Sequence, residues 1–146
     1  DTALDAALRA AGVELVCLAG FMRLLSAGFA ESWHDRLINI HPSLLPSFKG
    51  LDSHGQALKA GVRFSGCTVH FVRPEMDAGP IILQAAVPVL DGDDEDALAA
   101  RILEAEHRCY PLAVRLIAEG RISLENEIVR VAGGKFAEAP LLNPLG

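Results

Sequence analysis

The stretch LINIHPSLLPSFKG, residues 37–50, decides how the rest of the chain is interpreted. It begins as a short apolar strand and then runs into an asparagine, a histidine and two prolines. Because residues i and i+2 of a strand face the same side, Leu37, Asn39 and His41 share one face at the carboxyl end. Pro42 favours an extended backbone at His41, so the ring projects outward. Ligands bind beyond the carboxyl ends of strands in open α/β sheets, which predicts a polar site here. The alternative is that both side chains only satisfy backbone groups of the loop.

Helical and strand patterns alternate on both sides of this stretch. Helices are expected over residues 2–12, 26–34, 53–61 and 93–118, and strands over residues 14–20, 36–40, 66–72 and 80–90. Residues 121–133 predict a terminal hairpin with its turn near Glu125 and Asn126. The alternation predicts an α/β fold with a mostly parallel sheet, in which the last strands pair antiparallel at an edge. A length of 146 residues fits one domain, residues 1–146.

Composition and charge exclude several classes of function. A net charge of −6 with 5% aromatic residues argues against a nucleic-acid binder but leaves room for a small anionic substrate. No apolar run is long enough to cross a membrane, so no membrane partner is expected. Cys17, Cys67 and Cys109 form no CxxC spacing, which argues against zinc and against a disulfide framework. Buried thiols in a reducing, cytoplasmic setting are expected instead.

Two acidic residues are further candidates for a site. Asp77 lies in RPEMDAGP, residues 73–80, between a strand end and a Gly-Pro turn. A carboxylate beside His41 would favour the imidazolium form, which could act as a general acid or stabilise an oxyanion. Taken alone, Asp77 is more typical of a turn-forming residue. Glu106 lies within the apolar stripe of the long helix, where a carboxylate needs a partner or a solvent-filled cleft. The alternative is a salt bridge at the edge of that stripe.

Four segments taken together carry a more specific signal, namely LAGFMRLLS, INIHPSLLPSFKG, GCTVHFVRPEMDAGPIILQ and EHRCYP. They closely resemble the phosphoribosylglycinamide formyltransferases of the folate-dependent formyltransferase superfamily, over about residues 16–122. The resemblance implies a Rossmann-like formyltransferase fold. It also implies transfer of the formyl group of 10-formyltetrahydrofolate to the amine of glycinamide ribonucleotide in purine (IMP) biosynthesis, through a tetrahedral intermediate. These two small molecules are the implied partners, no metal is implied, and a homodimer is compatible with the family.

The resemblance also implies roles for individual residues. His41 is the general acid and oxyanion partner, Asn39 donates to the formyl oxygen, and Asp77 supports His41 and passes protons through water. The implied folate-binding residues lie in two segments: Met22, Arg23, Leu24 and Leu25, and Arg73, Pro74, Glu75 and Met76. The implied substrate-binding residues are Asn39 and Glu106, of which Glu106 faces the amine.

Two departures from the family and several alternatives accompany this interpretation. The family's amino-terminal strands and its Gly-rich phosphate loop have no match, so the chain is expected to be the carboxyl-terminal portion of the catalytic domain. Asp52 stands where the family often has a histidine.

Formyltetrahydrofolate deformylase, with water as the acceptor, is the nearest alternative, but Pro42 and EHRCYP favour the transferase. Methionyl-tRNA formyltransferase carries a different sequence around its Asn-x-His. A non-catalytic folate-binding fragment is the alternative from another class.

Overall fold

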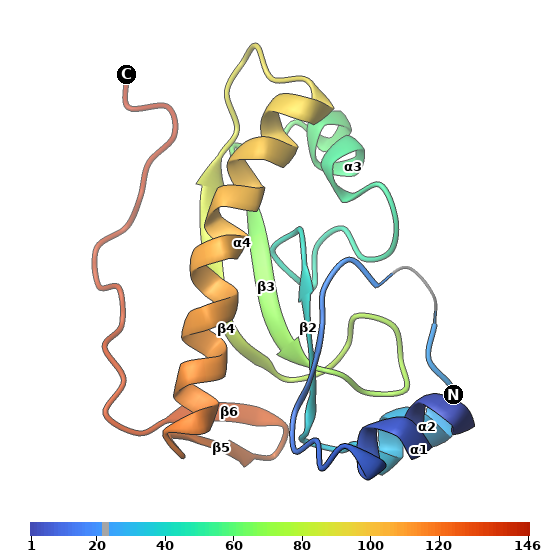
Figure 1. Cartoon of the computed structure of the whole chain (residues 1–146). Coiled ribbons are helices and arrows are strands. Elements are labelled where there is room, and N and C mark those ends of the chain that lie inside the picture. The colour runs from blue at the N-terminus through green and yellow to red at the C-terminus, as the bar shows by residue number, and fades with distance from the viewer. Residues whose placement is uncertain (22–23) are drawn as a thin grey trace.

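The computed structural model describes residues 1–21 and 24–146, with four helices and six strands in that part of the chain (Figure 1). The helices are α1 (Thr2–Ala10), α2 (Ala27–Ser32), α3 (Ser53–Ala60) and α4 (Glu95–Ala118). The strands are β1 (Val16–Leu18), β2 (Leu37–His41), β3 (Phe64–Phe71), β4 (Ile81–Pro88), β5 (Ile122–Glu125) and β6 (Ile128–Val131). The element order matches the expected one, and β2 extends one residue further than expected, so that His41 is its last residue.

The main sheet is mixed, with strand order β1-β2-β3-β4. Only β1 and β2 pair in parallel, whereas β2 with β3 and β3 with β4 pair antiparallel. The expectation of a mostly parallel sheet is therefore wrong for the described residues. A parallel return needs a crossover along the sheet. Here α3 stays at the end where β2 finishes, so β3 starts there and runs back, as Figure 1 shows.

Helices pack on the two faces of this sheet (Figure 1). Helix α4 packs on β3 and β4, and its buried Ile102 belongs to one core cluster with Ile38 and Ile40 of β2. Leu37 belongs instead to a second cluster, with Phe29 of α2 and side chains of α1. Because side chains alternate along a strand, Asn39 and His41 lie on the face of β2 that is turned away from α4.

Several smaller predictions can be compared with the structure. The helix expected from residue 26 is present as α2, and the hydroxyl of Ser26 caps it by accepting a hydrogen bond from the Phe29 N–H at 3.1 Å. The hairpin β5–β6 is confirmed, and it forms a separate two-stranded antiparallel sheet. Cys67 and Cys109 are buried as expected, but Cys17 is exposed on the edge strand β1. No helix in the described ranges is long and apolar enough to cross a membrane.

Tyr110 of α4 fastens the helix to the parallel pair of strands. Its phenol oxygen lies 2.5 Å from the carbonyl oxygen of Leu18 and 3.1 Å from that of Ile38. Tyr110→Phe removes the donor from a half-buried position, and we expect the free energy of unfolding to fall by about 1–2 kcal/mol. Urea unfolding monitored by circular dichroism measures this change. An unchanged unfolding midpoint would show that the phenol contributes nothing to docking of the helix.

Candidate active site

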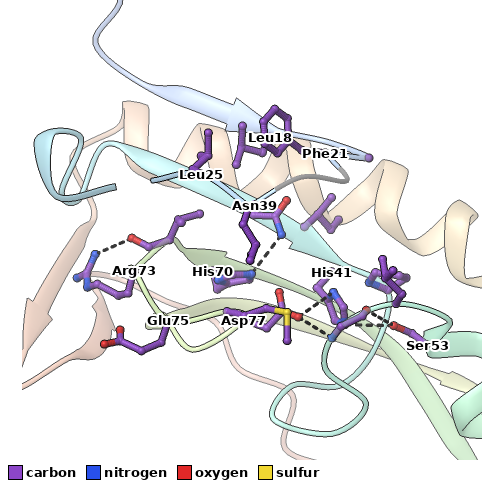
Figure 2. A pocket seen from close by; sticks show the side chains of 18 of the residues that line it. Leu18, Phe21, Leu25, Asn39, His41, Ser53, His70, Arg73, Glu75 and Asp77 are labelled. Atoms are coloured by element: carbon purple, nitrogen blue, oxygen red, sulfur yellow. Dashed lines mark hydrogen bonds and ion pairs between the residues drawn. The ribbon is translucent and has the colours of Figure 1, made fainter. Parts of the chain in front are cut away.

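A cavity of about 540 Å³ opens at the carboxyl ends of β1 and β2. Its volume is in the range of sites that bind small organic ligands. Figure 2 shows apolar side chains from β1 and the following segment on one side, and polar side chains from β2, β3 and two loops on the other. The predicted site residues that line it are Leu24, Leu25, Asn39, His41, Arg73, Pro74, Glu75, Met76, Asp77 and Glu106. Met22 and Arg23 lie outside the described residues.

The loop that follows β2 is anchored by Thr68 of β3, which is fully buried and lies opposite His41 in the strand register. The Thr68 hydroxyl donates to the carbonyl oxygen of Ser43 at 2.7 Å and accepts from the Leu45 N–H at 3.1 Å. One hydroxyl group therefore holds two backbone groups of the loop. This anchoring fixes the direction in which the chain leaves His41.

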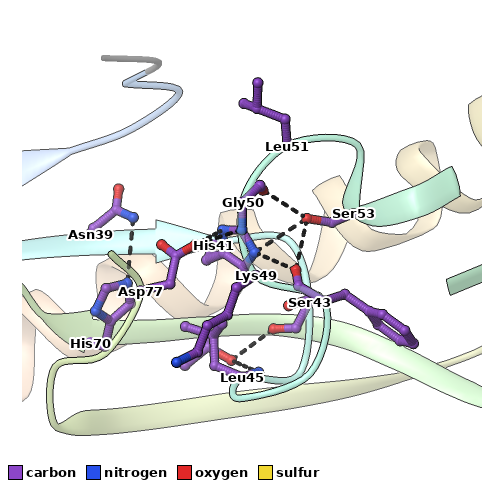
Figure 3. A network of polar contacts seen from close by, with 12 residues as sticks. Asn39, His41, Ser43, Leu45, Lys49, Gly50, Leu51, Ser53, His70 and Asp77 are labelled. Carbon is purple, nitrogen blue, oxygen red and sulfur yellow. Dashed lines mark hydrogen bonds and ion pairs between the residues drawn. The ribbon is translucent and has the colours of Figure 1, made fainter. Parts of the chain in front are cut away.

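The ring of His41 is buried and has a defined partner on each nitrogen (Figure 3). Its Nε2 lies 2.9 Å from the carbonyl oxygen of Phe48 and 3.2 Å from the hydroxyl of Ser53. Because a carbonyl oxygen only accepts, Nε2 carries a proton and donates it. Its Nδ1 lies 3.7 Å from the Oδ2 of Asp77. The His41 ring thus satisfies a backbone group of the loop, so the alternative interpretation of this residue is partly correct. The same contact leaves Nδ1 as the nitrogen that can gain or lose a proton.

Asp77 lies in the loop between β3 and β4 and adopts a positive φ of 52°. Its Oδ2 accepts a hydrogen bond from the Gly50 N–H at 2.9 Å, so the carboxylate joins two loops that are far apart in sequence. The chain can turn here because Gly79 has no side chain. A Cβ at this position would collide with the carbonyl oxygen of Phe71. Asp77 is therefore more than a local turn residue, since it contacts both the His41 ring and the loop that carries Gly50.

Asn39 lies directly opposite His70 in the antiparallel pairing of β2 and β3. Its Nδ2 is 3.4 Å from the Nε2 of His70. Both side chains line the cavity, and His70 is buried. Burial lowers the pKa of His70, which favours the neutral ring. Asn39, His41 and Asp77 thus meet at one cavity, although Asp77 comes from a distant loop.

Arg73 lines the cavity, but carboxylates outside it bind its guanidinium group. The Nε and Nη2 atoms donate to Glu127 at 2.8 Å and 3.1 Å, and Nη2 donates to Asp35 at 2.8 Å. The side chain is only 9% exposed. These bonds tie the loop after β3 to the β5–β6 hairpin. The charge of Arg73 is therefore already compensated, and a contact between this group and a ligand stays a prediction.

Glu106 reaches the cavity from α4. It is half-buried, and within the described part of the chain it forms no ion pair, so the salt-bridge alternative is not supported. Burial raises the pKa of Glu106, and the nearby rings of His107 and His41 partly oppose this shift. A carboxyl group that lines a ligand-sized cavity without a cationic partner can hydrogen-bond to a bound molecule.

Glu106→Gln is expected to raise the free energy of unfolding at neutral pH. Because burial raises the pKa of Glu106, the folded protein holds this proton more tightly than the unfolded chain. The resulting stabilisation is fully present below the unfolded pKa and is lost as the pH rises through the folded pKa. Glutamine keeps the shape of the side chain without ionising. Chemical unfolding over a series of acidic to neutral pH values tests this, and identical pH dependence in both proteins would contradict it.

Sequence reasoning missed part of the cavity wall. His70 was not among the predicted site residues, and the antiparallel register that brings it opposite Asn39 cannot be read from spacing along the chain. Ser53 contacts His41 because α3 begins beside the ring. Asp52, which departs from the family pattern, lines the cavity with a φ of 58°. Its carboxylate lies beside Glu95, whose pKa it raises through charge repulsion and a hydrogen bond.

Within the described residues, no group of three or more histidine, cysteine, aspartate or glutamate side chains could hold a metal ion. The polar side chains of the cavity are instead an amide, three imidazoles, a hydroxyl, a guanidinium and several carboxylates. Such a set can donate hydrogen bonds to a developing oxyanion and can move protons.

Comparison with known proteins supplies an independent finding. A family model described as "Formyl transferase" matches residues 1–114. The chain is 55% identical over 124 residues to the "Trifunctional purine biosynthetic protein adenosine-3" of Gallus gallus. The matched segment covers 85% of this chain and 12% of that protein. The chain therefore spans about an eighth of the length of this relative.

Solved structures resemble the chain as well. The phosphoribosylglycinamide formyltransferase of Anaplasma phagocytophilum superposes with a TM-score of 0.90 at 54% identity, covering 92% of this chain and 67% of that one. A formyltetrahydrofolate deformylase of Pseudomonas syringae superposes with a TM-score of 0.86 at 30% identity, covering 90% of this chain and 44% of that one. The same α/β architecture is thus shared with a formyltransferase and a deformylase.

Proposed function

The chain belongs to the formyl transferase family, and on that premise we propose that it carries the catalytic centre of a phosphoribosylglycinamide formyltransferase. The reaction transfers the formyl group of 10-formyltetrahydrofolate to the amine of glycinamide ribonucleotide, a step of purine biosynthesis. Residues 1–146 act as one catalytic domain in this proposal. The three free thiols are consistent with a cytoplasmic enzyme.

One observation carries the proposal: Asn39, His41 and Asp77 converge on a single ligand-sized cavity. Transfer of a formyl group passes through a tetrahedral intermediate whose oxygen becomes negatively charged. Preorganised donors aimed at that oxygen are the most effective way to lower such a barrier. The Asn39 amide and the His41 ring are two donors of this kind, and the Asp77 carboxylate lies 3.7 Å from Nδ1 of the ring.

The proposed reaction proceeds in two steps. The amine nitrogen forms a bond to the formyl carbon, and the carbonyl electron pair moves onto the oxygen. The Asn39 N–H and the proton on His41 Nδ1 donate hydrogen bonds to this oxyanion. A proton leaves the attacking nitrogen and reaches N10 of the folate through Asp77 and water. The bond between carbon and N10 then breaks, the carbonyl reforms, and tetrahydrofolate and the formylated ribonucleotide are released.

The remaining residues around the cavity suit the two substrates. Leu24, Leu25 and Met76 offer an apolar surface for the flat pteridine ring, and Leu24 and Met76 are more than half exposed. Burial of such surface contributes about 25 cal/mol per Å² to binding. The carboxyl group of Glu106 is available to the amine substrate, because it forms no ion pair within the described residues.

The experiment that tests the function is a product assay with 10-formyltetrahydrofolate, with and without glycinamide ribonucleotide. Because the chain covers 67% of the Anaplasma phagocytophilum enzyme, it is assayed alone and fused to the part of that enzyme it does not match. We expect formylated ribonucleotide by mass, formed only when the amine is present. Formate released without the amine would instead identify a deformylase. Folate binding without turnover in both proteins would indicate a non-catalytic binding fragment.

A further inference from the structure

His70 is a buried residue of the cavity wall to which the proposed mechanism gives no role. It lies on β3, directly opposite Asn39, and is 2% exposed. Figure 2 shows the His70 ring beside the Asn39 amide, on the same side of the sheet as His41 and Asp77. An imidazole in such a position either fills space or orients the neighbouring side chain. The two hydrogen bonds of His70 distinguish these roles.

The hydrogen bonds of His70 determine which of its nitrogens is protonated. Its Nδ1 lies 2.9 Å from the carbonyl oxygen of Phe71. A carbonyl oxygen only accepts, so Nδ1 carries the proton. In the neutral ring, Nε2 then presents a lone pair, and this atom lies 3.4 Å from the Nδ2 of Asn39. The ring can therefore accept a hydrogen bond from the asparagine but cannot donate one to it.

We propose that His70 is a positioning residue that fixes the amide of Asn39 so that an N–H, and not the carbonyl oxygen, faces the formyl oxygen. The Nδ2 of Asn39 carries two hydrogens, one for His70 and one for the cavity. With the amide turned over, its oxygen would face the lone pair of His70, which places an acceptor against an acceptor. The turned amide would also present an oxygen to the developing oxyanion. This inference rests on the proposed formyl transfer.

The kinetic test is a double-mutant cycle with Asn39. We expect His70→Leu to lower kcat roughly tenfold with little change in KM, and Asn39→Ala to lower it by about 10²–10³-fold. His70→Gln, which keeps an acceptor, is expected to recover most of the loss. Because His70 acts through Asn39, His70→Leu should have no further effect once Asn39 is alanine. Equal losses in both backgrounds would overturn the proposal.

A second measurement does not depend on activity or on a variant that folds. Long-range ¹H–¹⁵N correlation spectra of the labelled wild-type chain show which ring nitrogen of His70 is protonated. We expect a protonated Nδ1 and an unprotonated Nε2 at about neutral pH. A proton on Nε2 would overturn the positioning role even in an active enzyme. The expected tautomer in a protein that forms no formylated product would count against the proposed function and leave the contact between His70 and Asn39 standing.

Discussion

Replacement of His41 with alanine is expected to lower kcat by about 10³-fold, with little change in the KM for 10-formyltetrahydrofolate. In the proposed mechanism the ring delivers a proton to the formyl oxygen, and the Phe48 carbonyl holds Nε2 so that Nδ1 faces Asp77. We propose that folate binding rests mainly on the apolar side of the cavity, which the substitution leaves in place. Steady-state kinetics with both substrates varied measures the two parameters separately.

His34→Ala is the matched control for this substitution. His34 follows α2, its side chain is 56% exposed, and it pairs with Asp35 and does not line the cavity. We expect its kcat to remain that of the wild type. If His41→Ala retains full kcat while remaining folded, His41 has no part in the chemistry and the proposed mechanism fails.

The second large effect is expected for Asp77→Asn, with a loss of kcat of about 10²-fold or more. Asparagine has nearly the same shape, and its amide oxygen can still accept from the Gly50 N–H, so the two loops stay joined. What disappears is the negative charge beside Nδ1 of His41. Asp77→Ala removes the charge and the loop contact together, so this variant should also raise KM.

Asp91→Asn is the control for loss of a carboxylate. The Asp91 side chain is 96% exposed and pairs only with Arg63 among the described residues. Its kinetics should match those of the wild type. A kcat for Asp77→Asn within about twofold of the wild type would show that the charge of Asp77 does not contribute, and that its role is limited to holding Gly50.

The sequence predicted that Asn39 and His41 share one face because that arrangement depends on local rules. The alternation of strand side chains brought Asn39 and His41 onto one face, and the turn signal around Asp77 marked a loop at a strand end. The structure adds the link between them, since Asp77 contacts the His41 ring and the Gly50 backbone. Their meeting was implied by the resemblance to a family, and periodicity alone did not predict it.

The features that sequence reasoning got wrong or missed depend on long-range pairing. The mixed sheet follows from α3 remaining at one end, which the strand and helix pattern does not encode. That same antiparallel register brings His70 opposite Asn39. The two carboxylates that bind Arg73 come from residues 38 and 54 positions away in the chain. Such contacts become visible only when the tertiary structure is known.

The fate of the formyl carbon is the most direct test of the proposed transfer. The donor is prepared with a ¹³C-labelled formyl carbon and mixed with glycinamide ribonucleotide and enzyme, and the carbon is followed by NMR. We expect the label to move from the folate to the amide of the ribonucleotide, and His41→Ala and Asp77→Asn to slow this transfer. Label that appears as free formate, or that moves equally fast in both variants, would contradict formyl transfer by this site.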